Sequence, residues 1–277
     1  RGARVVANPT AWVTSLPPPE GKNSQAEFLW RVRALENRVV AVAATKVGVE
    51  ADTVIYAGRS QIVAADGRVV AVASDTEPEL LVADVEVPTD AGDRPTSARP
   101  PSAVIRRPPL RAGYLQVAVL THDDLLDGLA EHGVDVAVGP GGVLRAGHRS
   151  GDRSGDIALS SFTDDELLDP GAARSAALQG AEFVVWHARR VSTPFVEEVA
   201  RTRALENRVF VLLWRPPDQG GPAVVDPSGT VIARSAGERF AVQASCLRAA
   251  AATKAMAPGT DAWDAVAEFY ARSVGDS

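Results

Sequence analysis

The stretch RALENRV occupies residues 33–39 and recurs without a change at residues 203–209. Seven consecutive identities inside one chain indicate a repeated unit. Similar segments surround both copies: an apolar stretch lies upstream, and a glycine turn, Asp66-Gly67 or Ser228-Gly229, lies downstream. We therefore interpret the chain as a tandem duplication of one structural unit, with different loop lengths in its two copies.

Each copy predicts the same series of elements. Phe28, Val32 and Leu35 have the i, i+4, i+7 spacing of a helix with one buried face, so a helix is predicted to end in the heptapeptide. Short apolar runs predict strands, and the glycine turns predict hairpins. Besides the hairpin strands, the predicted strands are 5–8, 39–44 and 80–85 in the first copy, and 183–186, 209–213 and 240–244 in the second. Apolar strands that alternate with helices predict an α/β fold in which helices cover the sheet.

The second copy is preceded by further predicted elements. These are strands at 116–120, 134–138 and 156–160, and helices at 123–131 and 166–178. Between the copies, residues 88–113 hold six prolines and five arginines, a composition that favours an extended linker. We predict a first domain at residues 1–88, a linker at 89–113 and a second domain at 114–277.

The composition excludes several classes of protein. The 277 residues carry a formal net charge of −6 and are 45% hydrophobic, which argues against global disorder and against a general nucleic-acid binder. Because the sequence contains no run of 18 apolar, uncharged residues, no membrane partner is predicted. Cys246 is the only cysteine, so no internal disulfide and no thiolate metal site is expected, which fits a cytoplasmic location. We predict no cofactor and no metal.

Several motifs together resemble the nitrilase, or carbon–nitrogen hydrolase, superfamily. They are the heptapeptide before a valine-rich strand, Gly58-x-Ser60-x-Ile62, the turn Asp66-Gly67, Gly2-Ala3 followed by Pro9 and Trp12, and the segment 173–182. The resemblance implies a nitrilase-like α-β-β-α sandwich, present as a C-terminal half-domain at 1–88 and a shortened domain at 114–277. It also implies hydrolysis of amides, nitriles or carbamoyl groups by a cysteine nucleophile, a glutamate base and a lysine that stabilises the tetrahedral intermediate.

The residues of this triad are predicted to be absent from the chain. In the first copy they are expected before Arg1, with the nucleophile about 18 residues upstream. In the second copy Gly141 stands where the resemblance places the glutamate, and Ser160 stands where it places the cysteine. No lysine occurs between Val47 and Thr253. We therefore expect a degenerate second copy.

Two residues of the second copy are candidate nucleophiles. A serine hydroxyl needs a neighbouring base, and no histidine has a spacing that places one beside Ser160, so we expect an ordinary serine at the end of a strand. Cys246 falls in the last predicted strand, where we expect a small apolar core residue.

Two sets of charged residues have a structural and a functional interpretation. Glu36 and Glu206 precede the asparagine of the repeat, and a buried ion pair or helix-end bond is favoured over a catalytic role. His122, Asp123 and Asp124 form a group that suits a metal, but the group is expected instead to cap the helix that begins there.

The candidate substrate-binding residues are Asn8, Thr10 and Trp12. They lie at the end of the first predicted strand, which in the resemblance helps to line the substrate site. The alternative is that Trp12 packs under a surface loop, and the sequence favours neither interpretation.

Two functions follow from these observations. The first is a carbon–nitrogen hydrolase, of which this chain is a part, that acts on a small-molecule amide, nitrile or carbamoyl substrate. The alternative is a pseudoenzyme pair that serves as a binding or assembly module. Either a homo-oligomer or an intrachain pseudo-dimer is expected.

Overall fold

The computed structural model describes residues 2–17, 22–89, 112–129, 132–146, 157–235, 237–253, 255–257 and 260–261. The chain divides into two compact units, Arg1–Thr96 (unit 1) and Ser97–Ser277 (unit 2), and each is described by itself. Most of the predicted linker at 89–113 lies outside the described residues.

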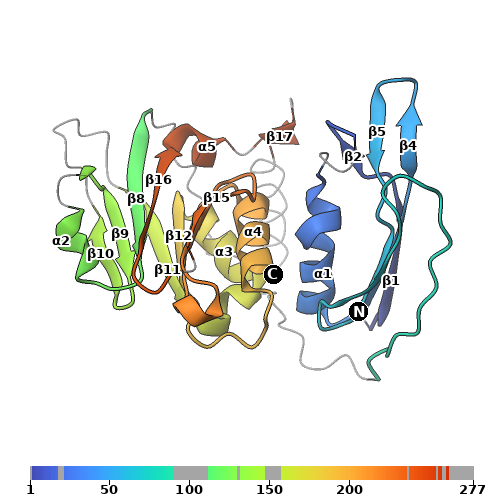
Figure 1. Ribbon diagram of the computed structural model, residues 1–277, viewed down its shortest axis with the longest axis horizontal. Helices are drawn as coiled ribbons and strands as arrows, with labels where there is room; N and C mark the ends of the chain where they lie inside the picture. The colour runs from blue at the N-terminus through green and yellow to red at the C-terminus, as the bar shows by residue number, and fades with distance from the viewer. Residues whose placement is uncertain are drawn as a thin grey trace, which may run out of the picture. The chain divides into compact units, whose positions relative to one another are not determined.

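Unit 1 is built on a four-stranded sheet with the order β1-β3-β6-β7 (Figure 1). The strands are β1 (Val5–Thr10), β3 (Val40–Thr45), β6 (Gln61–Val63) and β7 (Val69–Val72). β1 and β3 are parallel and are connected through a helix, η1 (Gln25–Leu29) continued by α1 (Trp30–Asn37). β6 and β7 form the predicted antiparallel hairpin. A three-stranded sheet of β2 (Val13–Thr14), β5 (Val54–Ala57) and β4 (Val47–Glu50) completes the unit.

Unit 2 contains two larger sheets. The first has the order β11-β12-β13-β14-β15, in which β11 (Leu159–Thr163), β12 (Phe183–His187) and β13 (Phe210–Trp214) are parallel. It ends in the predicted hairpin of β14 (Ala223–Val225) and β15 (Val231–Arg234). The second sheet has the order β10-β9-β8-β16, with β10 (Gly142–Ala146), β9 (Val136–Gly139), β8 (Tyr114–Leu120) and β16 (Ala241–Leu247). The short elements α5 (Arg248–Ala252), β17 (Ala255–Ala257) and β18 (Thr260–Asp261) follow.

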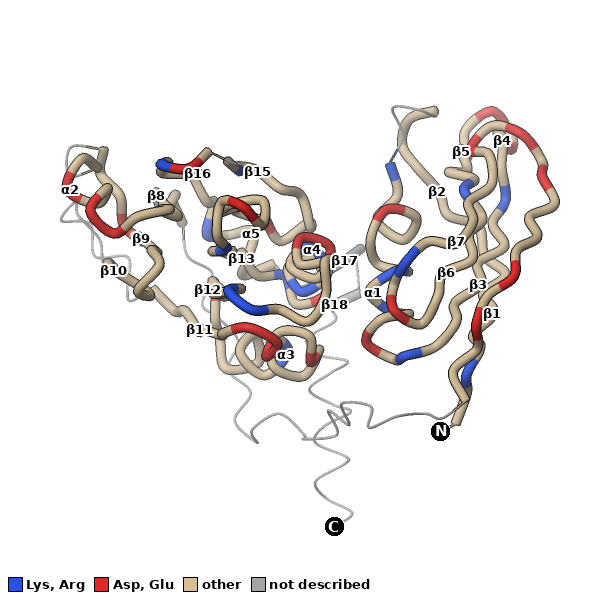
Figure 2. The backbone as a smooth tube through the Cα atoms, turned by 60° about the horizontal axis from the view of Figure 1, so that its bottom comes forward, with Lys and Arg blue, Asp and Glu red and all other residues tan. Residues whose placement is uncertain are grey.

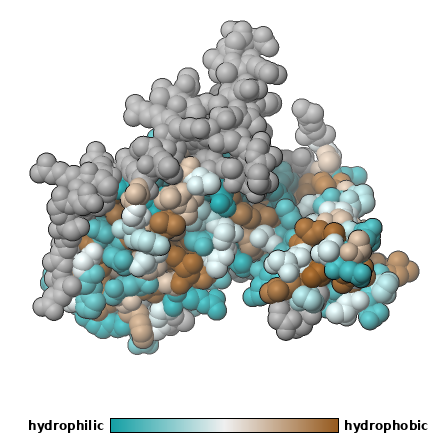
Figure 3. All heavy atoms as spheres, turned by 90° about the horizontal axis from the view of Figure 1, so that it is seen from above, coloured by the Kyte–Doolittle hydropathy of each residue, from teal (hydrophilic) through white to brown (hydrophobic). Residues whose placement is uncertain are grey.

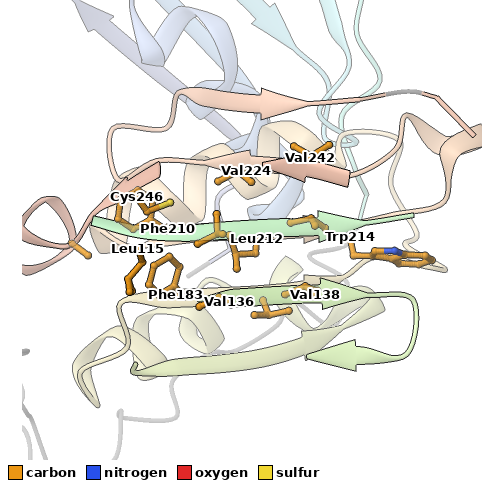
Figure 4. Packing of buried hydrophobic residues seen from close by; sticks show 14 residues of the cluster. Leu115, Val136, Val138, Phe183, Phe210, Leu212, Trp214, Val224, Val242 and Cys246 are labelled. Carbon is orange, nitrogen blue, oxygen red and sulfur yellow. The ribbon is translucent and has the colours of Figure 1, made fainter. Parts of the chain in front are cut away.

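The two sheets of unit 2 pack face to face. Figure 4 shows the side chains of β12 and β13 meeting those of β8, β9 and β16, and the rings of Phe183 and Phe210 stack with centroids 5.2 Å apart. The helices α3 (Pro170–Leu178) and α4 (Val196–Asn207) cover the outer face of one sheet, and α2 (Leu125–Gly128) covers the other (Figure 1). Unit 2 is therefore an α-β-β-α sandwich, as the sequence predicts.

Both copies of the heptapeptide end a helix in the same way. The asparagine of each copy donates from Nδ2 to the carbonyl oxygen of the arginine four residues earlier, at 3.0 Å in α1 and 2.8 Å in α4. The next residue, Arg38 or Arg208, adopts the left-handed region with φ of 48° and 50°. A left-handed residue directly after a helix is a common stop signal. The predicted end of a helix at the heptapeptide is confirmed in both units.

Three predicted elements differ from the structure. Residues 80–85 form no strand, because no neighbouring strand in the described part of unit 1 pairs with them. The helix predicted at 166–178 is divided into a 3₁₀ helix, η3 (Asp164–Leu168), and α3, since Asp169 caps a new helix that begins at Pro170. The helix predicted at 123–131 is limited to α2 among the described residues.

No helix in the described ranges combines the length and the apolar composition that crossing a bilayer requires.

Candidate functional site

Polar groups from both sheets of unit 2 meet where the parallel strands end. His187 at the end of β12 lies with its Nε2 3.0 Å from the carbonyl oxygen of Gly139 at the end of β9. Trp214 at the end of β13 donates from Nε1 to the carbonyl oxygen of Leu120 at the end of β8, at 2.9 Å. The carboxyl ends of parallel strands are where open α/β sheets bind ligands. We therefore consider this edge, defined by Asp123, Gly141, Asp164, His187 and Trp214, the candidate site and call it the unit 2 edge.

Asp123 fills the space beside two glycines of the edge. Its Oδ1 lies 2.0 Å from the point where a Cβ of Gly139 would lie, and its Oδ2 lies 3.0 Å from the corresponding point of Gly141. The backbone N–H of Gly141 points to Oδ1 at 3.5 Å. A side chain at position 141, where the resemblance expects a glutamate, would therefore meet the carboxylate of Asp123. Position 141 carries no base, and the carboxylate beside it comes from the segment after β8.

The structure corrects the position of Ser160. The predicted strand 156–160 is β11, which runs from Leu159 to Thr163, so Ser160 lies inside the strand and is paired with Val184. The residue that follows the strand is Asp164, with a φ of 42°. A strained residue between a strand and a helix is the geometry in which hydrolases of several folds hold a nucleophile. Asp164, rather than Ser160, is therefore the residue at the turn from β11 into η3, which we call the elbow of unit 2.

The carboxylate of Asp164 is hydrogen-bonded to the backbone of the loop after β12. Its Oδ1 accepts hydrogen bonds from the backbone N–H groups of Arg189 at 3.0 Å and Arg190 at 2.7 Å. Its carbonyl oxygen accepts from Trp186 Nε1 at 2.8 Å. Figure 2 shows this acidic segment between β11 and α3 beside the basic turn after β12. The carboxylate at the elbow therefore fixes the backbone of the loop that follows β12.

Sequence reasoning missed Asp164, although one local signal marks the turn. Thr163 and Glu166 form a capping box, in which the threonine side chain and the glutamate side chain each bond to the other's backbone N–H. That pattern fixes the start of η3 at the residue after Thr163. It does not predict the positive φ of Asp164, which depends on the contacts with the loop after β12.

His187 is buried at the edge. Removal from water lowers the pKa of its imidazole below the usual value, and the nearby positive charge of Arg189 acts in the same direction. The bond to Gly139 and the charge of Asp123 oppose this shift without reversing it. His187 is thus neutral near pH 7, with Nε2 as the donor to Gly139.

We expect unit 2 to lose stability as the pH falls below about 6.5, the pKa of an unperturbed histidine. In that range the unfolded chain binds a proton that folded His187 does not, so the free energy of unfolding decreases with falling pH until the folded pKa is passed. Urea unfolding of the wild type and of His187→Gln between pH 7.5 and 5.5 measures this component. A variant with an unchanged pH slope would contradict the assignment.

Cys246 is a core residue, as predicted. It lies on β16 with no exposed surface and packs in the cluster between the sheets. Burial, together with the negative charge of Asp226, raises the pKa of its thiol to about 12. A thiol that stays protonated in an apolar core is not a nucleophile.

We expect iodoacetamide at pH 8 to leave Cys246 unmodified in the folded protein, since about one thiol in ten thousand is ionised at that pKa and the sulfur is buried. In urea the same residue should react completely. Mass spectrometry of both samples measures this, and Cys246→Ser is the control. Reaction of the folded protein at the rate of the unfolded one would show that the core opens.

The glutamates of the heptapeptide form ion pairs, as the structural interpretation predicts. Glu36 Oε1 lies 2.6 Å from Arg33 Nη1, and Glu206 Oε2 lies 3.2 Å from Arg203 Nη1. Both pairs lie within one helix, three residues apart.

The expected cap at His122, Asp123 and Asp124 is wrong in its detail. Asp124 precedes α2, but its side chain makes no capping hydrogen bond and pairs with Arg239 at 2.6 Å instead. His122 Nδ1 lies 3.0 Å from Thr121 Oγ1. Within the described residues, no three histidine, cysteine, aspartate or glutamate side chains are grouped so as to hold a metal ion.

In unit 1, Asn8, Thr10 and Trp12 lie at the corresponding end of β1. Asn8 and Thr10 are half-buried, whereas the Trp12 side chain is buried in a cluster with Trp30. The backbone N–H of Trp12 donates to Thr45 Oγ1 at 3.1 Å, which connects the residue to the end of β3. The indole therefore packs beneath the helix of unit 1. The strand register pairs Asn8 with Ala43 and Thr10 with Thr45, at the end of β1.

Comparison with known proteins gives one family. Residues 1–90 match the carbon–nitrogen hydrolase family. No curated protein matches the chain.

Solved structures of the nitrilase superfamily resemble the chain distantly. An amidase from Nesterenkonia sp. shares 15% identity over 53% of this chain and 94% of its own, with a TM-score of 0.39. The NitFhit protein of C. elegans shares 14% identity over 80% of this chain and 45% of its own, with a TM-score of 0.32. Saccharomyces cerevisiae Nit3 shares 13% identity over 88% of this chain and 76% of its own, with a TM-score of 0.31. This chain thus spans less than half of NitFhit.

Proposed function

We propose that this chain is part of a carbon–nitrogen hydrolase of the amidase or nitrilase type, which acts on a non-peptide C–N bond of a small amide, nitrile or carbamoyl compound. The observation that carries the proposal is the family match of residues 1–90, which cover all the strands of unit 1. The reaction would use a cysteine thiolate, a glutamate and a lysine, all supplied by polypeptide outside residues 1–277. Asn8 and Thr10 at the end of β1 would border the substrate.

We propose further that unit 2 arose by duplication and performs no turnover. Gly141 has no side chain where a base is needed, and the elbow carries Asp164, whose carboxylate is held by two backbone N–H groups. A carboxylate in that position repels an oxyanion instead of stabilising it. Ser160, within β11, is paired along the strand and lies away from the elbow.

The second candidate is a pseudoenzyme that serves as a binding or assembly module. The observation in its favour is that side chains fill the unit 2 edge. The carboxylate of Asp123 occupies the space beside Gly141, where a base would be needed, and the carboxylate of Asp164 occupies the elbow, where a nucleophile would be needed. In both cases we propose a cytoplasmic protein that binds no nucleic acid or membrane and forms either a homo-oligomer or an intrachain pseudo-dimer.

The test compares residues 1–277 with the same chain extended by the polypeptide encoded upstream of Arg1. Both proteins are assayed against short aliphatic amides, nitriles and N-carbamoyl compounds. We expect turnover from the extended protein alone, and its loss when an upstream cysteine is replaced by alanine. No turnover by either protein would favour the pseudoenzyme. Turnover by residues 1–277 that is lost in Asp164→Asn would show that unit 2 is catalytic.

A further inference from the structure

Unit 1 has a hairpin that unit 2 lacks. The chain between β3 and β6 forms the hairpin of β4 and β5, whereas the connection between β13 and β14 in unit 2 forms the short 3₁₀ helix η4 (Pro217–Gln219). Figure 1 shows β4 and β5 side by side at the end of unit 1 opposite to the N-terminus. The backbone N–H of Lys46 donates to the carbonyl oxygen of Thr10 at 3.3 Å, and that of Ala57 donates to the carbonyl oxygen of Trp12 at 2.6 Å. The hairpin therefore begins and ends beside the candidate substrate-binding residues of β1.

Three polar side chains of this hairpin meet on one face. Lys46 and Glu50 lie two residues before and after Gly48, and Gly48 is paired with Tyr56 of β5. Alternate residues of a strand share a face, and so do directly paired residues. Glu50 Oε2 accepts hydrogen bonds from Lys46 Nζ and from the Tyr56 hydroxyl, each at 2.5 Å, and Nζ lies 4.6 Å from the centroid of the Tyr56 ring. We call Lys46, Glu50 and Tyr56 the hairpin cluster.

The hairpin cluster keeps a fixed state of charge. The hydrogen bond to Glu50 raises the pKa of the Lys46 ammonium, and the bonds from Lys46 and Tyr56 lower the pKa of the Glu50 carboxyl. The bond to Glu50 also raises the pKa of the Tyr56 phenol. A cation and an anion therefore lie side by side, and neither changes its charge between about pH 6 and 8.

The charged groups of the cluster border an open space. The side chains of Lys46 and Glu50 are 49% and 55% exposed. Among the described residues, Glu50 Oε1 accepts no hydrogen bond and two of the three ammonium hydrogens of Lys46 find no acceptor. Gly48 between them has a φ of 95°, and a Cβ at that position would meet no atom within 4 Å. The cluster thus has a donor and an acceptor to offer on the same side of the hairpin.

Apolar side chains lie on the same face. Val13 is paired with Tyr56 and Val54 is paired with Glu50, so both share the face of the cluster. They are 53% and 37% exposed. Figure 3, which views unit 1 from the side on which the hairpin lies, shows apolar side chains next to polar ones at its surface. The face therefore offers charge and apolar contact together.

We propose that the hairpin cluster binds the head group of an α-amino acid whose side chain ends in an amide, with the ligand carboxylate on Lys46 Nζ and the ligand ammonium on Glu50 Oε1. This inference rests on the proposed function, because it names the substrate class of the site at the end of β1. Lys46 and Glu50 are then specificity-determining residues for that reaction.

The pairing of opposite charges favours a zwitterion over a singly charged ligand. A carboxylate alone would be attracted by Lys46 and repelled by Glu50, and an ammonium group alone would meet the reverse. A zwitterion gives each member of the pair a charge-assisted hydrogen bond and adds no net charge. An uncharged amide would leave both groups to water.

The test is an NMR titration of residues 1–277 with L-glutamine, followed through the backbone amides of residues 46–57. We expect saturable shifts with a dissociation constant of about 10 mM, because water reaches both contacts. Glutaramate, which lacks the ammonium group, and 4-aminobutanamide, which lacks the carboxylate, should each bind about five-fold more weakly. Lys46→Met and Glu50→Gln should each weaken the binding of glutamine by about the same factor. Arg239→Met, which removes a similarly exposed cation from an ion pair of unit 2, is the matched control and should leave it unchanged.

Three outcomes would overturn the inference. They are the absence of saturable shifts below about 100 mM glutamine, equal affinity for glutamine and butanamide, and unchanged glutamine binding by Lys46→Met or Glu50→Gln, which would limit the cluster to stabilising the hairpin. Turnover is measured separately in the extended protein. Glutamine binding without turnover would defeat the proposed function and leave the inference standing, whereas turnover of butanamide with the same kcat/KM as glutamine would do the reverse.

Discussion

Replacing Arg248 with methionine is expected to lower the free energy of unfolding of unit 2 by about 3–5 kcal/mol, the usual cost of removing one partner from a buried ion pair. Arg248 and Glu182 are 1% and 3% exposed and form a bidentate pair, from Nε to Oε1 at 2.9 Å and from Nη2 to Oε2 at 2.7 Å. Arg248 follows β16 and Glu182 precedes β12, so the pair joins the two sheets. The variant leaves a buried carboxylate without its cation.

Urea unfolding of the full chain, followed by hydrogen exchange in unit 2, measures this loss. The double variant Glu182→Leu, Arg248→Met should recover most of the stability, because two apolar side chains leave no buried charge. Arg239→Met is the matched control, since Arg239 and Asp124 are both exposed and their pair is screened by water. An Arg248→Met midpoint as high as that of this control would contradict the assigned role of the pair.

The features that the sequence predicts are those that local interactions determine. The hairpin turns at Asp66-Gly67 and Ser228-Gly229 depend on residues within a few positions, and both form where expected. The helix ends at the heptapeptides depend on an asparagine that bonds four residues back. In each case the hydrogen-bonding partner lies nearby in the sequence.

The features that the sequence does not predict depend on distant partners. The positive φ of Asp164 is held by backbone N–H groups 25 and 26 residues further on. The carboxylate of Asp123 lies beside Gly139 at the end of β9 and beside Gly141 in the turn that follows, 16 and 18 residues further along the chain. Residues 80–85 have the composition of a strand, but a strand forms only by pairing with another strand, and no strand in the described part of unit 1 pairs with them. Composition predicts the capacity to pair, and the presence of a partner decides the outcome.

The arginine of the heptapeptide provides a direct comparison of the two units. In unit 2 the Arg203 side chain is wholly buried and donates to the carbonyl oxygens of Leu167 at 2.9 Å and Leu168 at 3.0 Å, at the end of η3. In unit 1 the identical residue, Arg33, is 42% exposed, and the described residues include no counterpart of η3. The same sequence thus occupies two environments, and the difference lies in what surrounds the helix.

We expect Arg203→Met to lower the free energy of unfolding of unit 2 by about 3–5 kcal/mol, because two carbonyl groups and Glu206 lose a buried cationic donor. The same change in unit 1, Arg33→Met, should cost about 0–1 kcal/mol, because water reaches the guanidinium and screens its pair with Glu36. Urea unfolding with hydrogen exchange resolves the two units in one chain. Equal losses would mean that the arginine acts within its own helix alone.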